Sequence, residues 1–181
     1  LYYSFKPILS NSSNQCIRFI VLDPFEISTF GALTEEFKNE AEELIKLKNK
    51  NVGIPNSNWY DGLSDEDMKY VPFNGSLSNE QIIWLDNFLK QAKDNKEYCF
   101  IFCHVSLYPG CVSPAGLVWN HEKVLKVIQS YNNVIACLYG HDHQGGYDID
   151  STGIHHLVIP APLECDLDEV TYGFMSIYDT F

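Results

Sequence analysis

The stretch FIFCHVSLYPG, residues 100–110, carries an apolar run directly into a histidine, after which the chain turns. A second stretch, CLYGHDHQGG at residues 137–146, has the same layout, with two histidines placed after a glycine. Short apolar runs of this kind, bounded by turn residues, predict buried β-strands at 98–103 and 134–139. Each predicted strand therefore delivers histidine at its carboxyl end.

These histidines are His104, His141 and His143. If the two strands are parallel neighbours joined by a helix at 121–131, all three side chains arrive at one edge of the sheet, where functional residues of α/β sheets gather. A lone histidine at the end of a strand is usually structural. Matching positions on two successive strands favour a metal site instead, because imidazole is the commonest metal ligand in proteins. Gly140 permits a sharp exit from the second strand.

The remaining pattern predicts a layered α/β or α+β domain with a mixed sheet and helices outside it. Thr34 and Ser78 are expected N-caps, with Ser78 and Gln81 forming a capping box, and Asn120 is expected to cap a third helix. The polar stretch 49–70 is too long for a simple connector. Strands are expected at 17–22, 98–103, 134–139, 154–159 and 174–178, and helices at 34–50, 78–92 and 121–131.

Composition narrows the class of protein. The 181 residues suit one domain, and the formal net charge of −12 disfavours nucleic acid as a partner. No stretch approaches the roughly 18 apolar residues of a membrane span. We interpret most of the six cysteines as buried free thiols rather than a disulfide framework, which indicates a reducing compartment such as the cytoplasm. The start at Leu1, without a charged-then-apolar leader, suggests a chain that begins within a longer protein.

Four segments together resemble one enzyme family. FNGSLSNEQIIWLDNFL, FIFCHVSLYP, GLVWNHEKVLKVI and GHDHQGG are similar to the manganese-dependent ADP-ribose/CDP-alcohol diphosphatases, which are calcineurin-like metallophosphoesterases. The resemblance implies a hydrolase that cleaves ADP-ribose, CDP-alcohols or similar nucleoside diphosphate conjugates to monophosphates at a two-metal site. His104 and His141 resemble ligands of one ion and His143 a ligand of the other. Manganese is the first expectation, with zinc, iron or magnesium as alternatives, and no other catalytic side chain is assigned.

The sequence departs from the family pattern in its carboxylates. The family's D-x-H, G-D and G-N-H motifs, which supply the bridging carboxylate and a substrate-orienting Asn–His pair, do not occur in order here. The WNHE at 119–122 lies between His104 and Gly140, so we assign its Asn120 and His121 to a helix start. We therefore expect residues 1–181 to be the C-terminal portion of a single metallophosphoesterase domain. The N-terminal half would be absent, leaving a partial β-sandwich flanked by helices, inactive and prone to aggregation alone.

Substrate contacts are predicted from the resemblance alone. It suggests Leu63, Gly116 and His156 as residues that approach the substrate, a small nucleoside diphosphate conjugate, in a protein that is a monomer when complete. Asp23, Asp142 and Glu164 stay open between structural and functional roles. Two other readings also stay open: a non-catalytic fragment or degenerate relative that binds nucleotide or metal, and a metallophosphoesterase that acts on another phosphoester.

Overall fold

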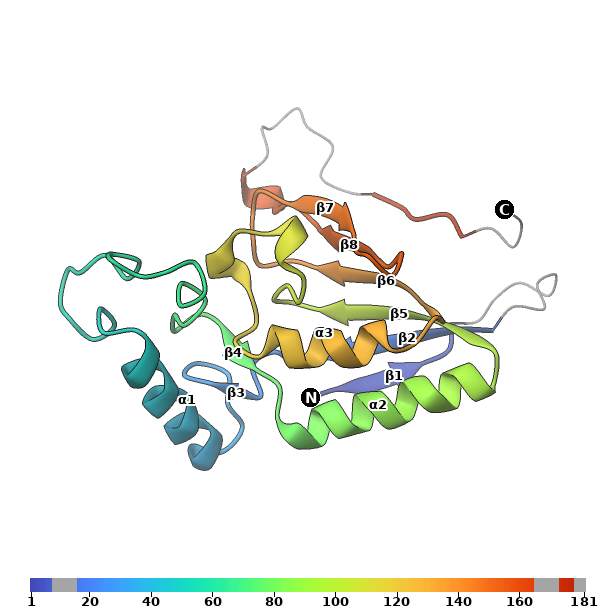
Figure 1. Cartoon of the computed structure of the whole chain (residues 1–181), viewed down its shortest axis with the longest axis horizontal. Helices are drawn as coiled ribbons and strands as arrows, with labels where there is room; N and C mark the ends of the chain where they lie inside the picture. Colours follow the sequence, from blue (N-terminus) through green and yellow to red (C-terminus); the bar gives the residue numbers. More distant parts are fainter. Residues whose placement is uncertain (8–15, 165–172, 178–181) are drawn as a thin grey trace.

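The computed structural model describes residues 1–7, 16–164 and 173–177. Its centre is a six-stranded mixed sheet in the order β1-β2-β5-β6-β8-β7 (Figure 1). The four inner strands run parallel to one another, and β1 and β7 pair antiparallel at the two edges. The strands are β1 (Tyr3–Phe5), β2 (Cys16–Leu22), β5 (Glu97–Cys103), β6 (Val134–Tyr139), β7 (Gly146–Ile149) and β8 (His155–Val158).

The register brings the carboxyl ends of the inner strands to one edge. Leu22 lies opposite Cys103, Phe102 opposite Leu138, and Tyr139 opposite Val158. The neighbours expected for strands 17–22, 98–103, 134–139 and 154–159 are therefore confirmed. This common edge is where the segments with His104 and His141 leave the sheet.

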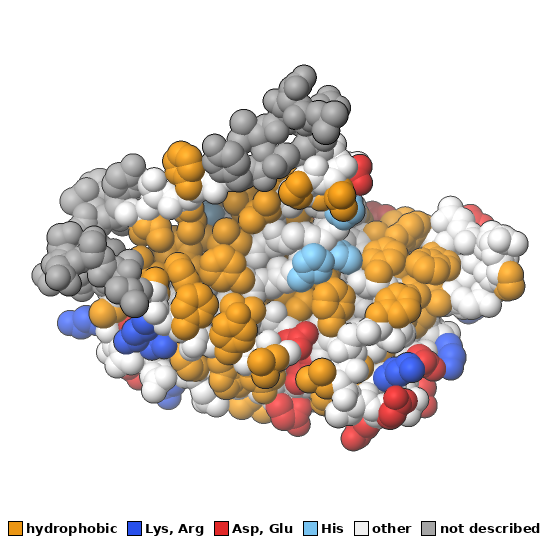
Figure 2. All heavy atoms as spheres, turned by 180° about the vertical axis from the view of Figure 1, so that it is seen from behind, with side chains coloured by type: hydrophobic (Ala, Val, Ile, Leu, Met, Phe, Trp, Pro, Cys, Tyr) orange, Lys and Arg blue, Asp and Glu red, His pale blue; other side chains and the backbone are white. Residues whose placement is uncertain are grey.

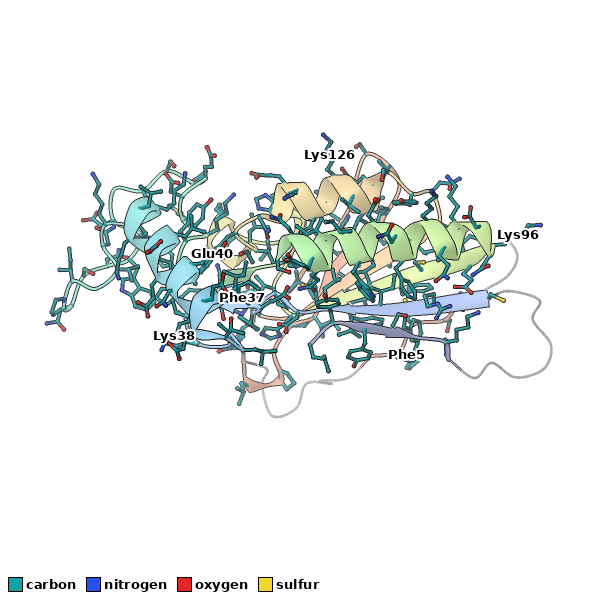
Figure 3. All side chains as sticks on the ribbon, turned by 90° about the horizontal axis from the view of Figure 1, so that it is seen from below. Phe5, Phe37, Lys38, Glu40, Lys96 and Lys126 are labelled. Carbon is teal, nitrogen blue, oxygen red and sulfur yellow. The ribbon has the colours of Figure 1, made fainter. Side chains whose placement is uncertain are left out.

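Two helices cover one face of the sheet. Helices α2 (Asn79–Asp94) and α3 (His121–Gln129) lie on the same side of the strands, whereas Phe5 points away from them (Figure 3). The apolar positions of α2 recur at helical spacing and are buried at Ile82, Leu85 and Leu89, where they join the main core. This core fills the space between the helices and the strands.

The helix caps agree with the sequence in part. Thr34 Oγ1 accepts the backbone N–H of Phe37, and Ser78 Oγ accepts that of Gln81. The reciprocal half of the expected capping box comes from elsewhere: Glu26 accepts the N–H of Ser78 at 3.0 Å, and the Gln81 amide donates to Glu26 at 2.6 Å. Gln81 is not available for the reciprocal bond, because its Oε1 accepts a backbone N–H from the turn after β2 at 2.8 Å.

Asn120 precedes α3 but does not cap it with its side chain, contrary to expectation. Its amide bonds both backbone groups of Leu77 instead, accepting at 3.2 Å and donating at 2.8 Å. The physical reason is that the Leu77 segment runs alongside and offers a donor and an acceptor together. Asn120 therefore joins the entrance of α3 to the entrance of α2.

A smaller unit sits at one end of the molecule (Figure 1). Helix α1 (Glu35–Lys48) packs against a two-stranded sheet of β3 (Ile27–Ser28) and β4 (Gly75–Ser76). Its own small core contains Ile45 and Trp119. The backbone N–H of Trp119 donates to the carbonyl of Gly75, so the segment before α3 is fixed to β4.

The second face of the main sheet is apolar and lies open. Ile17, Phe100 and Ala136 are buried there, with Phe19 and Phe102 packed around them, and no helix of the described part of the chain crosses this face. Figure 2 shows this face as largely hydrophobic, with histidine side chains near its centre. We call it the open face.

Two expectations for the C-terminal region were wrong or incomplete. Residues 173–177 form no strand, although one was expected over 174–178, and Tyr178 lies outside the described residues. A strand needs a neighbour to receive its hydrogen bonds, and an apolar run alone does not provide one. The expectation also missed β7, because the glycines at its start indicate a loop.

The cysteines behave as expected where they are described. Cys99, Cys103, Cys111 and Cys137 are buried free thiols, and Cys16 is exposed and free. Cys165 lies outside the described residues. Within the described ranges, no helix has the length and apolar character to cross a membrane.

Candidate metal centre

His104 and His141 meet at the carboxyl edge of the sheet. Their ring centroids lie 5.2 Å apart, with the rings nearly perpendicular. Side chains alternate along β5, so that Ile101 and Cys103 face the helices, and the next residue, His104, turns toward the open face. The carbonyl of His104 accepts the N–H of Gly140 at 2.9 Å, which continues the β5–β6 pairing past the last strand residue.

The backbone around Gly140 is shaped for this close approach. A Cβ atom at Gly140 would lie 3.3 Å from Nδ1 of His104, tighter than most side-chain contacts. The following residue, His141, has a φ of 68°, in the left-handed region that non-glycine residues seldom adopt. Conformations of this kind cluster at functional sites, where the surrounding structure holds them in place.

All three predicted histidines line one pocket of about 540 Å³ on the open face. The pocket lining also includes the apolar residues Phe102, Leu138 and Ile159. Burial, with a contribution from His104, lowers the pKa of His141 to about 4. Burial also lowers the pKa of His104, with a contribution from His143. Near neutral pH these rings are therefore uncharged and retain the lone pair that a metal ion requires.

Residues that the sequence did not single out surround His141. Phe25 lies 5.8 Å from His104 and 6.5 Å from His141 between ring centroids, and Phe73 lies 5.6 Å from His141. Asn74, which is fully buried, lies with Oδ1 2.7 Å from Nε2 of His141. The only signal for Phe73 and Asn74 was their place at the start of a segment that resembles the diphosphatase family.

His143 stands at the more exposed end of the pocket. Its Nδ1 lies 3.0 Å from a carboxylate oxygen of Glu164, and both side chains are more than half exposed. Asp142 accepts the N–H of Gln144 and shapes the turn between the histidines and β7. Glu164, whose role the sequence left open, thus has a direct contact with a predicted ligand.

Comparison with known protein families identifies the family to which the region around these histidines belongs. A family model described as "Calcineurin-like phosphoesterase" matches residues 27–145, a span that contains all three histidines. The chain belongs to the calcineurin-like phosphoesterase family.

Individual relatives agree with that assignment. Enzymes named manganese-dependent ADP-ribose/CDP-alcohol diphosphatase are 37% identical over 178 residues in Arabidopsis thaliana and 36% identical over 179 residues in Oryza sativa. Each match covers 98% of this chain, and 55% and 53% of the respective relative. A crystal structure of a dimetal phosphatase from Danio rerio superposes with a TM-score of 0.76 at 31% identity, over 88% of this chain and 49% of that one. The chain thus spans about half the length of these relatives.

The described side chains fit part of a phosphoesterase metal centre. His104 and His141 offer two neutral nitrogen donors at adjacent positions, which suits one side of a single ion. Among the described residues, however, no group of three or more His, Cys, Asp or Glu side chains is placed to hold a metal ion. The donors present are therefore suitable in kind and insufficient in number, and they include no bridging carboxylate.

The structure does not bring the predicted substrate residues to this pocket. Leu63 is half-buried in the turn-rich stretch after α1, and its N–H donates to the carbonyl of Tyr60. Gly116 is buried behind the histidine loop, where a Cβ would lie 2.5 Å from Val112 and 3.7 Å from the Asp142 carboxylate. Neither residue lines the pocket that contains the histidines.

His156, the third residue predicted to approach the substrate, has a side chain that is 0% exposed. Its ring stacks on Tyr108 with centroids 4.3 Å apart, and its two nitrogens lie 2.9 Å from the Tyr139 hydroxyl and 3.2 Å from the Asp150 carboxylate. Because side chains alternate along β8, the His156 ring points toward the side of the sheet that the helices cover, away from the open face. In this structure it is a core histidine with polar partners, and its predicted contact with substrate stays a prediction.

His121 also lies apart from the three histidines. It is buried beside Lys69 in a separate pocket of about 270 Å³, and its Nδ1 lies 3.1 Å from the carbonyl of Val118. This position agrees with the helix-start role expected for the WNHE segment. Asp23 accepts the N–H of Phe25 at 3.0 Å, which agrees with a turn after β2.

Proposed function

We propose that this chain forms part of a metal-dependent phosphoanhydride hydrolase that cleaves ADP-ribose, CDP-alcohols or similar nucleoside diphosphate conjugates to monophosphates. The observation that carries the proposal is the convergence of His104, His141 and His143 on one open pocket at the carboxyl edge of a phosphoesterase sheet. The names of the relatives supply the substrate class. The pocket volume of about 540 Å³ is consistent with a small-molecule site.

The proposed centre holds two divalent ions, with manganese first and zinc, iron or magnesium as alternatives. His104 and His141 would serve one ion, and His143 the other. Such ions lower the pKa of bound water and neutralise charge that develops on phosphate oxygens. The protein's own contribution includes Phe25 and Phe73, whose rings border the histidines and exclude water from one side of the site.

We further propose that the working enzyme contains a second structural half of the kind that makes up the rest of the relatives' length. Three neutral imidazoles cannot balance two divalent cations, so anionic ligands are needed. The open face supports the same proposal, because the pocket continues directly into its apolar surface. Residues 1–181 would then be the C-terminal portion of one metallophosphoesterase domain. The buried free thiols are consistent with a cytoplasmic protein.

The test is hydrolysis of ADP-ribose with Mn²⁺ by the 181-residue chain and by the same chain joined to the N-terminal half of a relative. We expect no turnover by the chain alone and turnover by the joined protein. In the joined protein, His104→Ala, His141→Ala and His143→Ala should each reduce kcat/KM by more than about 100-fold, because loss of an outer partner of a metal ligand already costs about 10–100-fold. Rapid turnover by the chain alone would show that its ligand set is complete.

His121→Ala is the matched control, since it also removes a histidine but in the separate pocket beside Lys69. It should retain activity within about tenfold of the parent. A His121→Ala protein as inactive as His141→Ala would place the WNHE segment in the catalytic site. A panel that includes phosphomonoesters separates the proposed reaction from a phosphoesterase with a different substrate.

The insufficient ligand set favours one alternative, a non-catalytic chain that binds nucleotide or metal without turnover. The joined protein decides between the two. Binding of Mn²⁺ without hydrolysis of any compound in the panel would favour the alternative.

A further inference from the structure

Asn74 links three segments that are far apart in the sequence. It is fully buried just before β4, and its Nδ2 donates to the backbone carbonyls of Lys69, at 2.9 Å, and Ala115, at 2.6 Å. Its Oδ1 lies 2.7 Å from Nε2 of His141. One side chain thus joins the end of the turn-rich stretch, the loop before α3 and the loop after β6.

These contacts fix which way the amide points. Backbone carbonyls only accept hydrogen bonds, so the NH₂ group of Asn74 must face Lys69 and Ala115. Rotating the amide by half a turn would place its oxygen against both carbonyls and leave them without donors in a buried position. The atom that faces His141 is therefore an acceptor, and the assignment follows from the bonding pattern.

An acceptor opposite Nε2 requires that this nitrogen carry the proton. A neutral imidazole has one N–H and one lone pair, so the lone pair of His141 then resides on Nδ1. Within the described residues, no hydrogen bond to Nδ1 of His141 is formed. We propose that Asn74 is a positioning residue that holds His141 as the Nε2–H form and keeps its Nδ1 lone pair free for the metal ion. The position of the proton follows from the hydrogen bonds alone, and only the role of the lone pair as a metal ligand rests on the proposed function.

The arrangement gives the loop after β6 an anchor that its own sequence lacks. His141 has a left-handed backbone, and the 2.7 Å hydrogen bond to Asn74 holds its ring. The partners of metal-ligating histidines commonly fix ring orientation in this way, and their loss costs about 10–100-fold in metal affinity. Asn74 is thereby a link between β4 and the metal site, and not merely a buried amide of the loop.

The test reads the proton directly, by ¹⁵N NMR of the histidine side chains in metal-free protein at about pH 8, where an ordinary imidazole is neutral. His141 should appear as the Nε2–H form alone, with an Nε2 proton that exchanges slowly with water. In Asn74→Ala that exchange should accelerate by at least about tenfold, and an Nδ1–H form should become detectable, since the acceptor is gone.

Asn120→Ala is the control, because the Asn120 amide hydrogen-bonds the Leu77 backbone and, among the described residues, forms no hydrogen bond with a histidine side chain. It should leave the His141 signals unchanged. Mn²⁺ affinity of the joined protein should fall about 10–100-fold in Asn74→Ala and by less than about twofold in Asn120→Ala.

Three results would overturn the proposal: a wild-type His141 with its proton on Nδ1, an Nε2 proton equally protected in Asn74→Ala, or an equal response in Asn120→Ala. If Asn74→Ala does not fold, the wild-type spectrum still decides, because a proton on Nδ1 of His141 contradicts the proposal. The NMR measurement uses neither metal nor substrate. A joined protein that shows the expected protons without hydrolysing ADP-ribose would therefore reject the proposed function and leave the role of Asn74 intact.

Discussion

At Gly140, a single added methyl group would press on the ring of His104 and so alter its distance from His141. The φ of Gly140 is not in the left-handed region, so alanine fits the backbone, but the added Cβ would lie 3.3 Å from Nδ1 of His104. We expect Gly140→Ala to change the free energy of unfolding by less than about 1 kcal/mol. The displaced His104 ring should reduce the Mn²⁺ affinity of the joined protein by about tenfold, as measured by titration with detection of free Mn²⁺.

Gly153→Ala provides the opposite case. Gly153 has a φ of 88° in the turn between β7 and β8, and a Cβ there would meet no atom within 4 Å. This variant should lose about 1–2 kcal/mol of stability through backbone strain and keep its Mn²⁺ affinity. If Gly140→Ala lost stability and retained affinity, the close contact with His104 would not be what requires glycine at that position.

At the scale of residues, the sequence predicted the placement of the strand-end histidines better than the residues that surround them. His104 and His141 are marked by the apolar runs that precede them, because strand direction alone sends both to one edge. Asn74 carries no such mark, since its contact with His141 spans 67 positions and depends on the packing of three loops. The burial of His156 was not predictable from its likeness to a family histidine, because it depends on which way side chains alternate along β8.

The turn between β7 and β8 carries a buried acid–base pair that links strand β8 to helix α3. The Asp150 carboxylate accepts hydrogen bonds from Gln129 at 2.8 Å and from Thr152 at 2.7 Å, and it faces His156. Burial alone raises the pKa of Asp150, but the bonds from Gln129, Thr152, Ile154 and His156 outweigh it and hold the pKa well below its usual range. Burial lowers the pKa of His156, and Asp150 offsets this only in part.

The lowered pKa values of Asp150 and His156 both make the folded protein less stable as the pH falls. A group whose pKa is lower in the folded state stabilises the fold above its unfolded pKa and loses that contribution as the pH falls. For His156 the loss begins below about pH 6.5, and for Asp150 it begins below about pH 4. We expect the free energy of unfolding to decrease from about pH 7 to about pH 5, and His156→Gln to reduce this decrease while lowering stability at pH 7. Urea denaturation at the two pH values measures both effects.

The neighbouring His155→Gln is the control for that experiment. His155 lies next to His156 on β8 but is exposed and contacts Tyr147 rather than Asp150. Its substitution should leave the pH dependence as in the parent chain. An unchanged pH dependence in His156→Gln would assign the acid sensitivity to other buried histidines, of which His121 is one, since burial lowers its pKa as well.

Elements were predictable where the pattern is local. The helices α1 and α2 have capping residues and apolar stripes within their own sequences, and Thr34 and Ser78 act as expected. The contribution of Glu26 to the start of α2 was not predictable, because it arrives from a distant turn. Strand β7 exists through its pairing with β8, and residues 173–177 form no strand despite an apolar run. A strand is thus a property of two segments, and a single sequence pattern reports only one of them.

The two faces of the main sheet differ enough to govern how the whole molecule behaves in solution. Apolar side chains stay exposed on the open face, including Phe5 at 44% and Leu157 at 38%. Large exposed apolar patches promote association. We expect the 181-residue chain alone to self-associate, and Leu157→Lys to increase its monomeric fraction several-fold in light-scattering measurements.

Ile83→Lys is the matched control, since Ile83 is 61% exposed but lies alone on α2, which covers the other face. It should not change the monomeric fraction of the chain. In the joined protein the expectation reverses, because Leu157→Lys would then place a charge in a buried layer and lower the melting temperature. A monodisperse parent chain with a sharp, reversible thermal transition would contradict the expectation and indicate that the open face is stable in water.

The strand order also has a consequence for the time course of folding. The pairing of β5 with β6 brings together residues such as Cys99 and Val134, which are separated by the crossover helix α3. The pairing of β2 with β5 brings together residues much farther apart in the sequence, such as Cys16 and Glu97. Contacts between distant residues form more slowly, because more chain entropy is lost before they stabilise anything. The β5–α3–β6 unit can therefore assemble before β2 docks, and it already contains both His104 and His141. Substitutions in α3 should accordingly slow refolding, whereas substitutions in β2 should mainly accelerate unfolding.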